Sequence, residues 1–258
     1  MSNRPSPDYR ALNQMFGRHI RSFGTVDDRV KAHFDLKIRH TYEVVRNIEE
    51  IAIQEGMDEH TVQLSRVIAL LHDLGRFRQF MEFGTFDDTK SLNHAELSVR
   101  VIEKEGFGKL IPEEERDVVT RSILQHNQPE ITVSPENKAA LYSRLLRDAD
   151  KIDIWKLQSK MDVVYALGEF GSQDQYTVPA GILDCFREKR IVRLEMAGSL
   201  NDFRLLRLGW IFDMHFRATF RHLVRKDYAT RILSKIPASP ELRKITGIIN
   251  QYMLHRSL

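Results

Sequence analysis

The chain has 258 residues, of which 42% are hydrophobic and 29% are charged, and this is enough apolar material for a substantial core. A disordered chain and a minimal stapled scaffold are therefore excluded. The formal net charge is only +3, and the single cysteine, Cys185, excludes an internal disulfide framework and a cysteine-based zinc finger. Lone cysteines of this kind are typical of a reducing, cytoplasmic location, and we expect Cys185 to be a buried apolar residue.

No apolar run is long enough to cross a bilayer, so we expect no membrane span. The longest run, residues 67–71, is bounded by Arg66 and His72. Residues 1–10 are polar and lack the apolar centre of a signal peptide, which indicates a short loose arm.

Helical periodicity, together with helix start and stop residues, predicts an all-α fold. Predicted helices cover about residues 27–54, 58–75, 93–106, 112–127 and 136–159. Asp27 or Asp28, Asp58 and Asn93 are side chains that commonly cap helix N-termini, and Gly75 is interpreted as a helix stop. Residues 189–195 are ambiguous between strand and helix. Without a repeat or an obvious linker, one domain over residues 1–258 is the simplest organisation.

Six polar residues fall on helix faces that should be apolar and therefore point inward. They are His40, His72, Asp73, His94, His126 and Asp150. A single buried histidine is more often a core residue bonded to a carbonyl. A buried carboxylate, however, costs several kcal/mol unless an arginine or a metal ion neutralises it. Four imidazoles and two carboxylates without a thiolate are typical of a site for Fe, Mn, Co, Ni, Zn or Mg.

The pattern of His40, then His72-Asp73 within LLHDLGRF, then Asp150 within RDADKIDIW, resembles the signature of the HD-domain metal-dependent phosphohydrolase superfamily over about residues 30–160. The resemblance implies a helical bundle in which these four residues hold a divalent metal. It places the metal-binding core at about 27–160 and leaves a mainly helical C-terminal extension at about 161–258.

His94 and His126 make the chain similar to those HD proteins that hold a second ion. By that resemblance, His40, His72, Asp73 and Asp150 bind one metal, while Asp73, His94 and His126 bind the other. The alternative is a site with a single metal ion, in which His94 and His126 either support the metal ligands or contact the substrate phosphate.

Basic residues beside the ligands suggest a phosphate contact. Arg76, which occupies a place where the family often has a basic residue, is expected to bind substrate phosphate. Arg78 is expected to be solvated, and Lys151 suits either role equally. We count Asp73, Arg76 and Lys151 as candidate catalytic residues.

The function expected from the resemblance is hydrolysis of a nucleotide or another small phosphorylated metabolite by a metal-bound hydroxide at a dinuclear His/Asp site. A mixed-valent di-iron oxygenase and a non-catalytic metal-containing sensor are the alternatives. Residues 186–258 hold 15 Lys and Arg against 6 Asp and Glu, which is more typical of solvated helix faces than of a nucleic-acid site. This segment could shape the pocket, bind polyphosphate or form a homo-oligomer contact.

Overall fold

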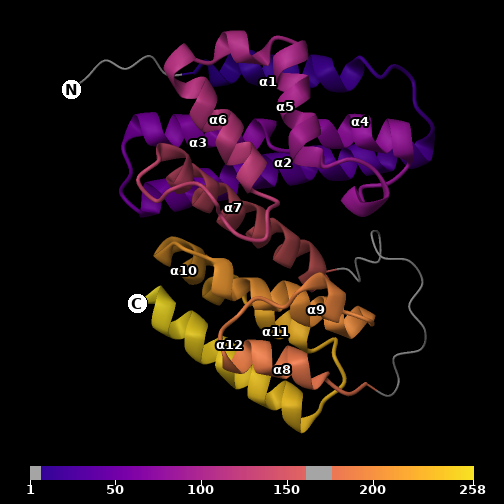
Figure 1. Cartoon of the computed structure of the whole chain (residues 1–258), viewed down its shortest axis with the longest axis vertical. Helices are drawn as coiled ribbons and strands as arrows, with labels where there is room; N and C mark the ends of the chain where they lie inside the picture. Colours follow the sequence, from indigo (N-terminus) through magenta and orange to yellow (C-terminus); the bar gives the residue numbers. More distant parts are fainter. Residues whose placement is uncertain (1–6, 161–175) are drawn as a thin grey trace. The chain divides into compact units, whose positions relative to one another are not determined.

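A computed structural model describes residues 7–160 and 176–258, and every regular element in these ranges is a helix (Figure 1). The predicted all-α class is therefore confirmed. No helix in the described ranges combines the length and apolar character needed to cross a membrane.

The chain divides into two compact units, Met1–Asp150 and Lys151–Leu258. The division falls inside α7 (Lys138–Lys160), and all six candidate metal ligands belong to the first unit. The expected start of a C-terminal extension at residue 161 lies outside the described residues. That the two units make up a single domain stays a prediction.

Capping side chains begin three helices of the first unit where the sequence predicts. The helices before α7 are α1 (Tyr9–Arg21), α2 (Asp28–Gln54), α3 (Glu59–Leu71), α4 (Leu74–Phe83), α5 (His94–Lys104) and α6 (Glu113–Gln125). Asp27, Asp58 and Asn93 each accept a hydrogen bond from a backbone N–H in the first turn of α2, α3 and α5, respectively. The N-termini of these three helices are therefore determined locally.

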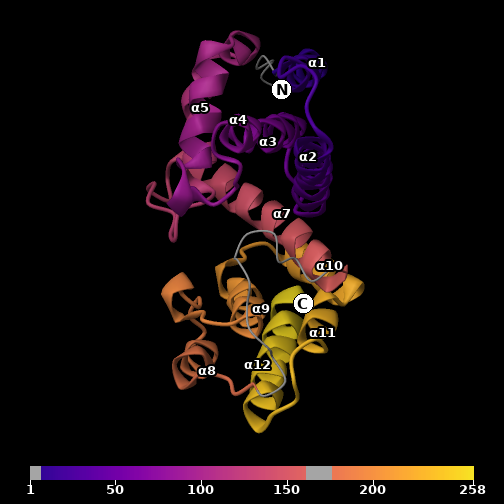
Figure 2. The same ribbon diagram turned by 90° about the vertical axis from the view of Figure 1, so that its right-hand side faces the viewer.

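Helix α3 forms the centre of the first unit's core. Its residues Leu64, Val67, Ile68, Leu70 and Leu71 are fully buried. Helices α3 and α4 lie between α2 and α5 in the view of Figure 2, and the closest helix pairs are α2 with α3 and α4 with α5. This packing holds the C-terminal end of α3, where His72 and Asp73 follow, inside the bundle.

Two local predictions for this unit differ from the structure. The helix expected over 58–75 ends at Leu71, and Gly75 lies within α4. A Cβ on Gly75 would be 2.5 Å from Leu97 Cβ and 2.6 Å from the His94 carbonyl oxygen. Gly75 is therefore present because α5 passes close to it, not because a helix stops there.

Helix α1 begins at Tyr9, within the segment expected to be a loose arm. The carboxylate of Asp8 accepts a hydrogen bond from the Ala11 N–H, which caps the helix, and Leu12 and Phe16 on its inner face are buried. Residues 1–6 lie outside the described ranges.

The second unit contains short helices around α12 (Pro240–Ser257). They are α8 (Ala180–Arg187), α9 (Leu200–Gly209), α10 (Arg217–Lys226) and α11 (Tyr228–Leu233). Helix α12 packs mainly on α10 and α8. Residues 189–195, the ambiguous segment, contain no strand. Cys185 is buried, as predicted.

Candidate metal centre

Four of the six candidate ligands lie at the ends of helices in the first unit, and the other two lie within helices. His72 and Asp73 form the break between α3 and α4, His94 is the first residue of α5, and His126 directly follows α6. His40 comes from the middle of α2 and Asp150 from α7. Residues far apart in the sequence are thus brought to one place.

Two groups of potential ligands share Asp73. One contains His40, His72 and Asp73, the other Asp73, His94 and His126, and within each group the candidate ligand atoms lie within 4.8 Å of one another. All five side chains are buried. The sixth candidate, Asp150, lies with Oδ1 3.0 Å from Nε2 of His40. The six residues singled out from helix faces are therefore neighbours in the fold.

The imidazole rings are oriented by acceptors at Nδ1. Nδ1 lies 2.7 Å from the Ala69 carbonyl oxygen in His72 and 2.6 Å from the Ile123 carbonyl oxygen in His126. Because a carbonyl can only accept a hydrogen bond, both Nδ1 atoms must carry the proton. This leaves a lone pair on each Nε2, the atom that faces the centre of the site.

A cation would resolve the unfavourable contacts that these lone pairs create. Nε2 of His94 lies 2.9 Å from Nε2 of His126, and Nε2 of His72 is buried without a hydrogen-bond partner in the described part of the chain. Nδ1 of His94 faces Oδ2 of Asp88 at 2.6 Å, so His94 and His126 both carry the proton on Nδ1 and cannot hydrogen-bond to each other through Nε2. Imidazole nitrogens beside carboxylate oxygens suit a divalent transition metal, so the donor set fits the ions that the sequence predicts.

Burial keeps two of the imidazoles in the neutral, metal-binding form. Burial, reinforced by the nearby Arg76, lowers the pKa of His94 to about 4. Burial, reinforced by His72, lowers the pKa of His126 to about 4 as well. Both rings are therefore neutral at pH 7.

The carboxylates remain ionised although they are buried. Burial alone would raise the pKa of Asp73, but Lys37 and the neighbouring His72 and Arg76 hold it well below its usual range. Burial acts on Asp150 in the same direction, and the hydrogen bond and charge of His40 outweigh it, so this pKa is also well below its usual value. The site therefore combines two anions with the neutral imidazoles of His94 and His126, which favours a cation.

Three residues that support the site were not found from the sequence. Nζ of Lys37 lies 2.8 Å from Oδ2 of Asp73. Arg147 donates to the carbonyl oxygens of Gln125 and His126 at 3.0 and 3.3 Å, so it binds the C-terminal end of α6. Each of these two residues precedes a ligand, His40 or Asp150, by three positions on the same helix, and this spacing was the available signal. The third, Asp88, comes from the loop before α5.

Arg76, predicted to bind phosphate, is already engaged within the protein. Its NH1 group donates to Oε1 of Gln79 at 2.8 Å and to Oδ1 of Asp88 at 2.9 Å. Its Nε lies 3.6 Å from Oδ1 of Asp73. The guanidinium thus links Asp73 to the segment that precedes α5.

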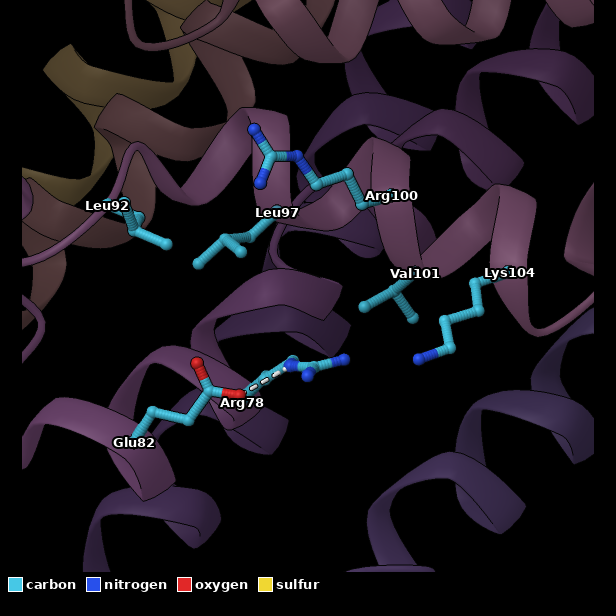
Figure 3. A pocket seen from close by; sticks show the side chains of 7 residues that line it. All are labelled: Arg78, Glu82, Leu92, Leu97, Arg100, Val101 and Lys104. Carbon is cyan, nitrogen blue, oxygen red and sulfur yellow. Dashed lines mark hydrogen bonds and ion pairs between the residues drawn. The ribbon is translucent and has the colours of Figure 1, made fainter.

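Lys151 and Arg78 have other partners. The ammonium of Lys151 forms an ion pair with Asp213 and donates to the Asp213 carbonyl oxygen at 2.8 Å, within the second unit. Arg78 pairs with Glu82 on the surface, in agreement with the expected solvated position. It lines a shallow hollow of about 270 Å³ between α4 and α5, where Leu92, Leu97 and Val101 are flanked by basic side chains (Figure 3). None of the candidate metal ligands lines this hollow.

One comparison with known proteins bears on this site. Searches of curated proteins and of solved structures found no significant match. Residues 38–155 match the family model of the HD domain, a span that includes all six candidate ligands. HD domains bind divalent metals and are mostly metal-dependent phosphohydrolases, so the match indicates a hydrolase-type function that depends on metal. Residues 38–155 are therefore identified as an HD-type domain by this match, and their His/Asp cluster is compatible with the metal site of that family.

Proposed function

We propose that the protein is a metal-dependent phosphohydrolase that acts on a nucleotide or another small phosphorylated metabolite, with two divalent ions at its His/Asp site. The observation that supports this most directly is the pair of buried ligand groups that share Asp73. One carboxylate common to two groups of imidazoles is the arrangement expected of a bridging ligand.

In this proposal His40, His72, Asp73 and Asp150 hold the first ion, and Asp73, His94 and His126 hold the second. Fe, Mn, Co, Ni, Zn and Mg all suit these ligands. When bound, a pair of such ions lowers the pKa of a coordinated water and offsets the negative charge of a phosphoryl group.

The cations around Asp73 divide into two kinds. Lys37 lies against Oδ2 of Asp73 and keeps a side-chain exposure of 17%, so its ammonium can also face an incoming anion. We assign it the role of attracting the substrate phosphate. Arg76 is less exposed and already bonded through NH1, which suits it to holding Asp73 and Asp88 in place, with a phosphate contact as its further candidate role. Lys151 would have to exchange its partner Asp213 to bind phosphate.

The test is phosphate release by the purified full-length protein, loaded separately with Mn²⁺, Fe²⁺, Co²⁺, Ni²⁺, Zn²⁺ or Mg²⁺, from a panel of nucleotides and sugar phosphates. We expect turnover that depends on the metal and is abolished in Asp73→Ala, because that variant lacks the shared ligand. Absence of release with every metal would refute the proposal. Oxygen consumption by the iron-loaded protein on substrate addition, without phosphate release, would refute it in favour of an oxygenase.

A matched pair of variants on α2 tests the ligand assignment. His40→Gln should lose the first ion, whereas His33→Gln should retain both. His33 stacks on Phe80 with ring centroids 4.2 Å apart, and its Nδ1 donates to the Arg29 carbonyl oxygen. Equal metal content in the two variants, measured by elemental analysis after dialysis, would contradict the role of His40.

A further inference from the structure

Asp88 makes the shortest contact of any carboxylate to His94. It begins the short helix η1 (Asp88–Lys90), between α4 and α5, and its Oδ2 lies 2.6 Å from Nδ1 of His94. The side chain of Asp88 is 29% exposed, while that of His94 is buried. An ionised carboxylate can only accept a hydrogen bond, so Nδ1 of His94 carries the proton and Nε2 is left as the ligand atom.

The position of His94 in its helix explains why a side chain is needed here. His72 and His126 donate from Nδ1 to the carbonyl oxygen of the residue three positions earlier, which belongs to the preceding helical turn. His94 is the first residue of α5, and residues 91–93 are not helical. No carbonyl of a preceding turn lies below its ring, so the acceptor has to come from another segment.

Asp88 is itself held so that it cannot turn away. Its Oδ1 accepts hydrogen bonds from NH1 of Arg76 and from Nε2 of Gln79, each at 2.9 Å. Gln79 is fully buried, and its Nε2 also lies 2.8 Å from both Oγ of Ser91 and the Leu92 carbonyl oxygen. One oxygen of Asp88 is thus fixed to α4, and the other is directed at the ring of His94.

We propose that Asp88 is the positioning residue of the second metal, and that Arg76 and Gln79 act through it. Asp88 fixes both the orientation and the tautomer of His94. Nε2 of His94 therefore stays unprotonated and faces the second ion, which Asp73 and His126 would also bind. The inference rests on the proposed two-ion site. By this inference, the segment between α4 and α5 serves to position a ligand of the second ion.

The substitution Asp88→Asn tests the tautomer directly, because asparagine has one acceptor oxygen and one NH₂ group. Arg76 and Gln79 both donate toward the position of Oδ1, so they will bind the asparagine oxygen there. The NH₂ group then faces Nδ1 of His94, which must become an acceptor. The proton moves to Nε2, and His94 can no longer bind the metal.

The experiment is a Zn²⁺ titration of the full-length protein, with metal content measured after dialysis and histidine tautomers read by ¹⁵N NMR of the zinc-loaded protein. In Asp88→Asn we expect the second ion to bind about 10- to 100-fold more weakly, the range typical for loss of a group that orients a ligand histidine. The first ion should bind as in the wild type. His94 should show a proton on Nε2, while His72 keeps its proton on Nδ1.

Asp87→Asn is the matched control, because it makes the same change of charge one residue away. The carboxylate of Asp87 accepts hydrogen bonds from Thr89, and the hydrogen bonds and ion pairs of His94 are to other residues, so this variant should bind both ions. Asp88→Glu, which retains a carboxylate, should bind the second ion more tightly than Asp88→Asn does.

Retention of both ions at wild-type affinity in Asp88→Asn would overturn the proposal. If that variant fails to fold, ¹⁵N NMR of the zinc-loaded wild type still tests the proposal. A proton on Nε2 of His94 in the wild type would also overturn the proposal. Both readouts are independent of turnover. A protein that binds two ions but hydrolyses no phosphoester would therefore refute the proposed function and leave this inference standing.

Discussion

The close approach of α4 to α5 should make Gly75→Ala damaging both to the fold and to the second metal position. Gly75 follows Asp73 by two residues, and its N–H donates to Oγ of Ser98 at 2.8 Å. That hydroxyl, which is buried, lies 2.8 Å from the His72 carbonyl oxygen and 2.9 Å from that of His94. Gly75 and Ser98 therefore connect the segments that carry three candidate ligands.

The size of the effect follows from the distances. The added methyl group would lie 2.5 Å from both Leu97 Cβ and Ser98 N, whereas carbon atoms in contact are about 3.5–4.0 Å apart. The contacts are with backbone and Cβ atoms, which cannot rotate away, so α5 must shift by roughly 1 Å. Overpacking of this kind costs about 1–3 kcal/mol, and disturbing the Ser98 hydrogen bonds adds about 1 kcal/mol. We expect a total loss of about 2–4 kcal/mol in the free energy of unfolding.

Urea unfolding of the metal-free protein measures the stability loss, and a Zn²⁺ titration measures the effect on the site. Because His94 begins α5, a shift of that helix should weaken the second ion more than the first. Gly108→Ala is the matched control: it makes the same substitution in the same unit, and a Cβ there would have no heavy atom within 4 Å.

Stability within about 0.5 kcal/mol of the wild type, together with unchanged binding of both ions, would refute this reasoning. It would mean that α4 and α5 can separate without cost, and that the position of His94 does not depend on their contact.

Three further predictions concern other parts of the site. Arg147→Met should lower the free energy of unfolding by about 3 kcal/mol in urea titrations, because the carbonyl oxygens of Gln125 and His126 lose a charged, buried donor. Arg147→Lys should lower it less, and equal losses in the two variants would contradict this role. Lys37→Met should raise the KM for a phosphorylated substrate more than it lowers kcat, and an unchanged KM would exclude a phosphate contact. The pKa values of His94 and His126 are about 4 in the fold and 6.5 in a free histidine, so the unfolded chain takes up protons first as the pH falls. The free energy of unfolding of the metal-free protein should therefore reach its full value above pH 6.5 and fall as the pH is lowered toward 4, by about 1.4 kcal/mol per pH unit for each ring. A free energy of unfolding that does not change between these pH values in urea titrations would contradict neutral buried rings.

Helix starts and candidate ligands could be predicted because both depend on neighbours in the sequence. Asp27, Asp58 and Asn93 cap the helices that follow them through bonds to N–H groups two or three residues away. The inward faces of His94 and Asp150 follow from helical periodicity, which places a residue relative to apolar side chains one turn away.

The roles of Asp88 and Gly75 could not be predicted in this way. Asp88 shows its role only when α4, α5 and the segment between them are folded together, since its partners Arg76 and Gln79 lie 12 and 9 residues earlier in the chain. The sequence pattern indicates a helix stop at Gly75, whereas its close neighbour Leu97 lies on another helix and is brought near only by the packing.

By itself, the sequence determined that the chain is helical, where several helices begin, and which imidazoles and carboxylates point inward. Each of these properties follows from the chemistry of residues within a few positions of one another. The tertiary structure alone decided that Lys37 and Arg76 keep Asp73 ionised and that Asp88 orients His94. These relations join atoms that only the packing of α2, α4, α5 and α6 brings within hydrogen-bonding or ion-pairing distance.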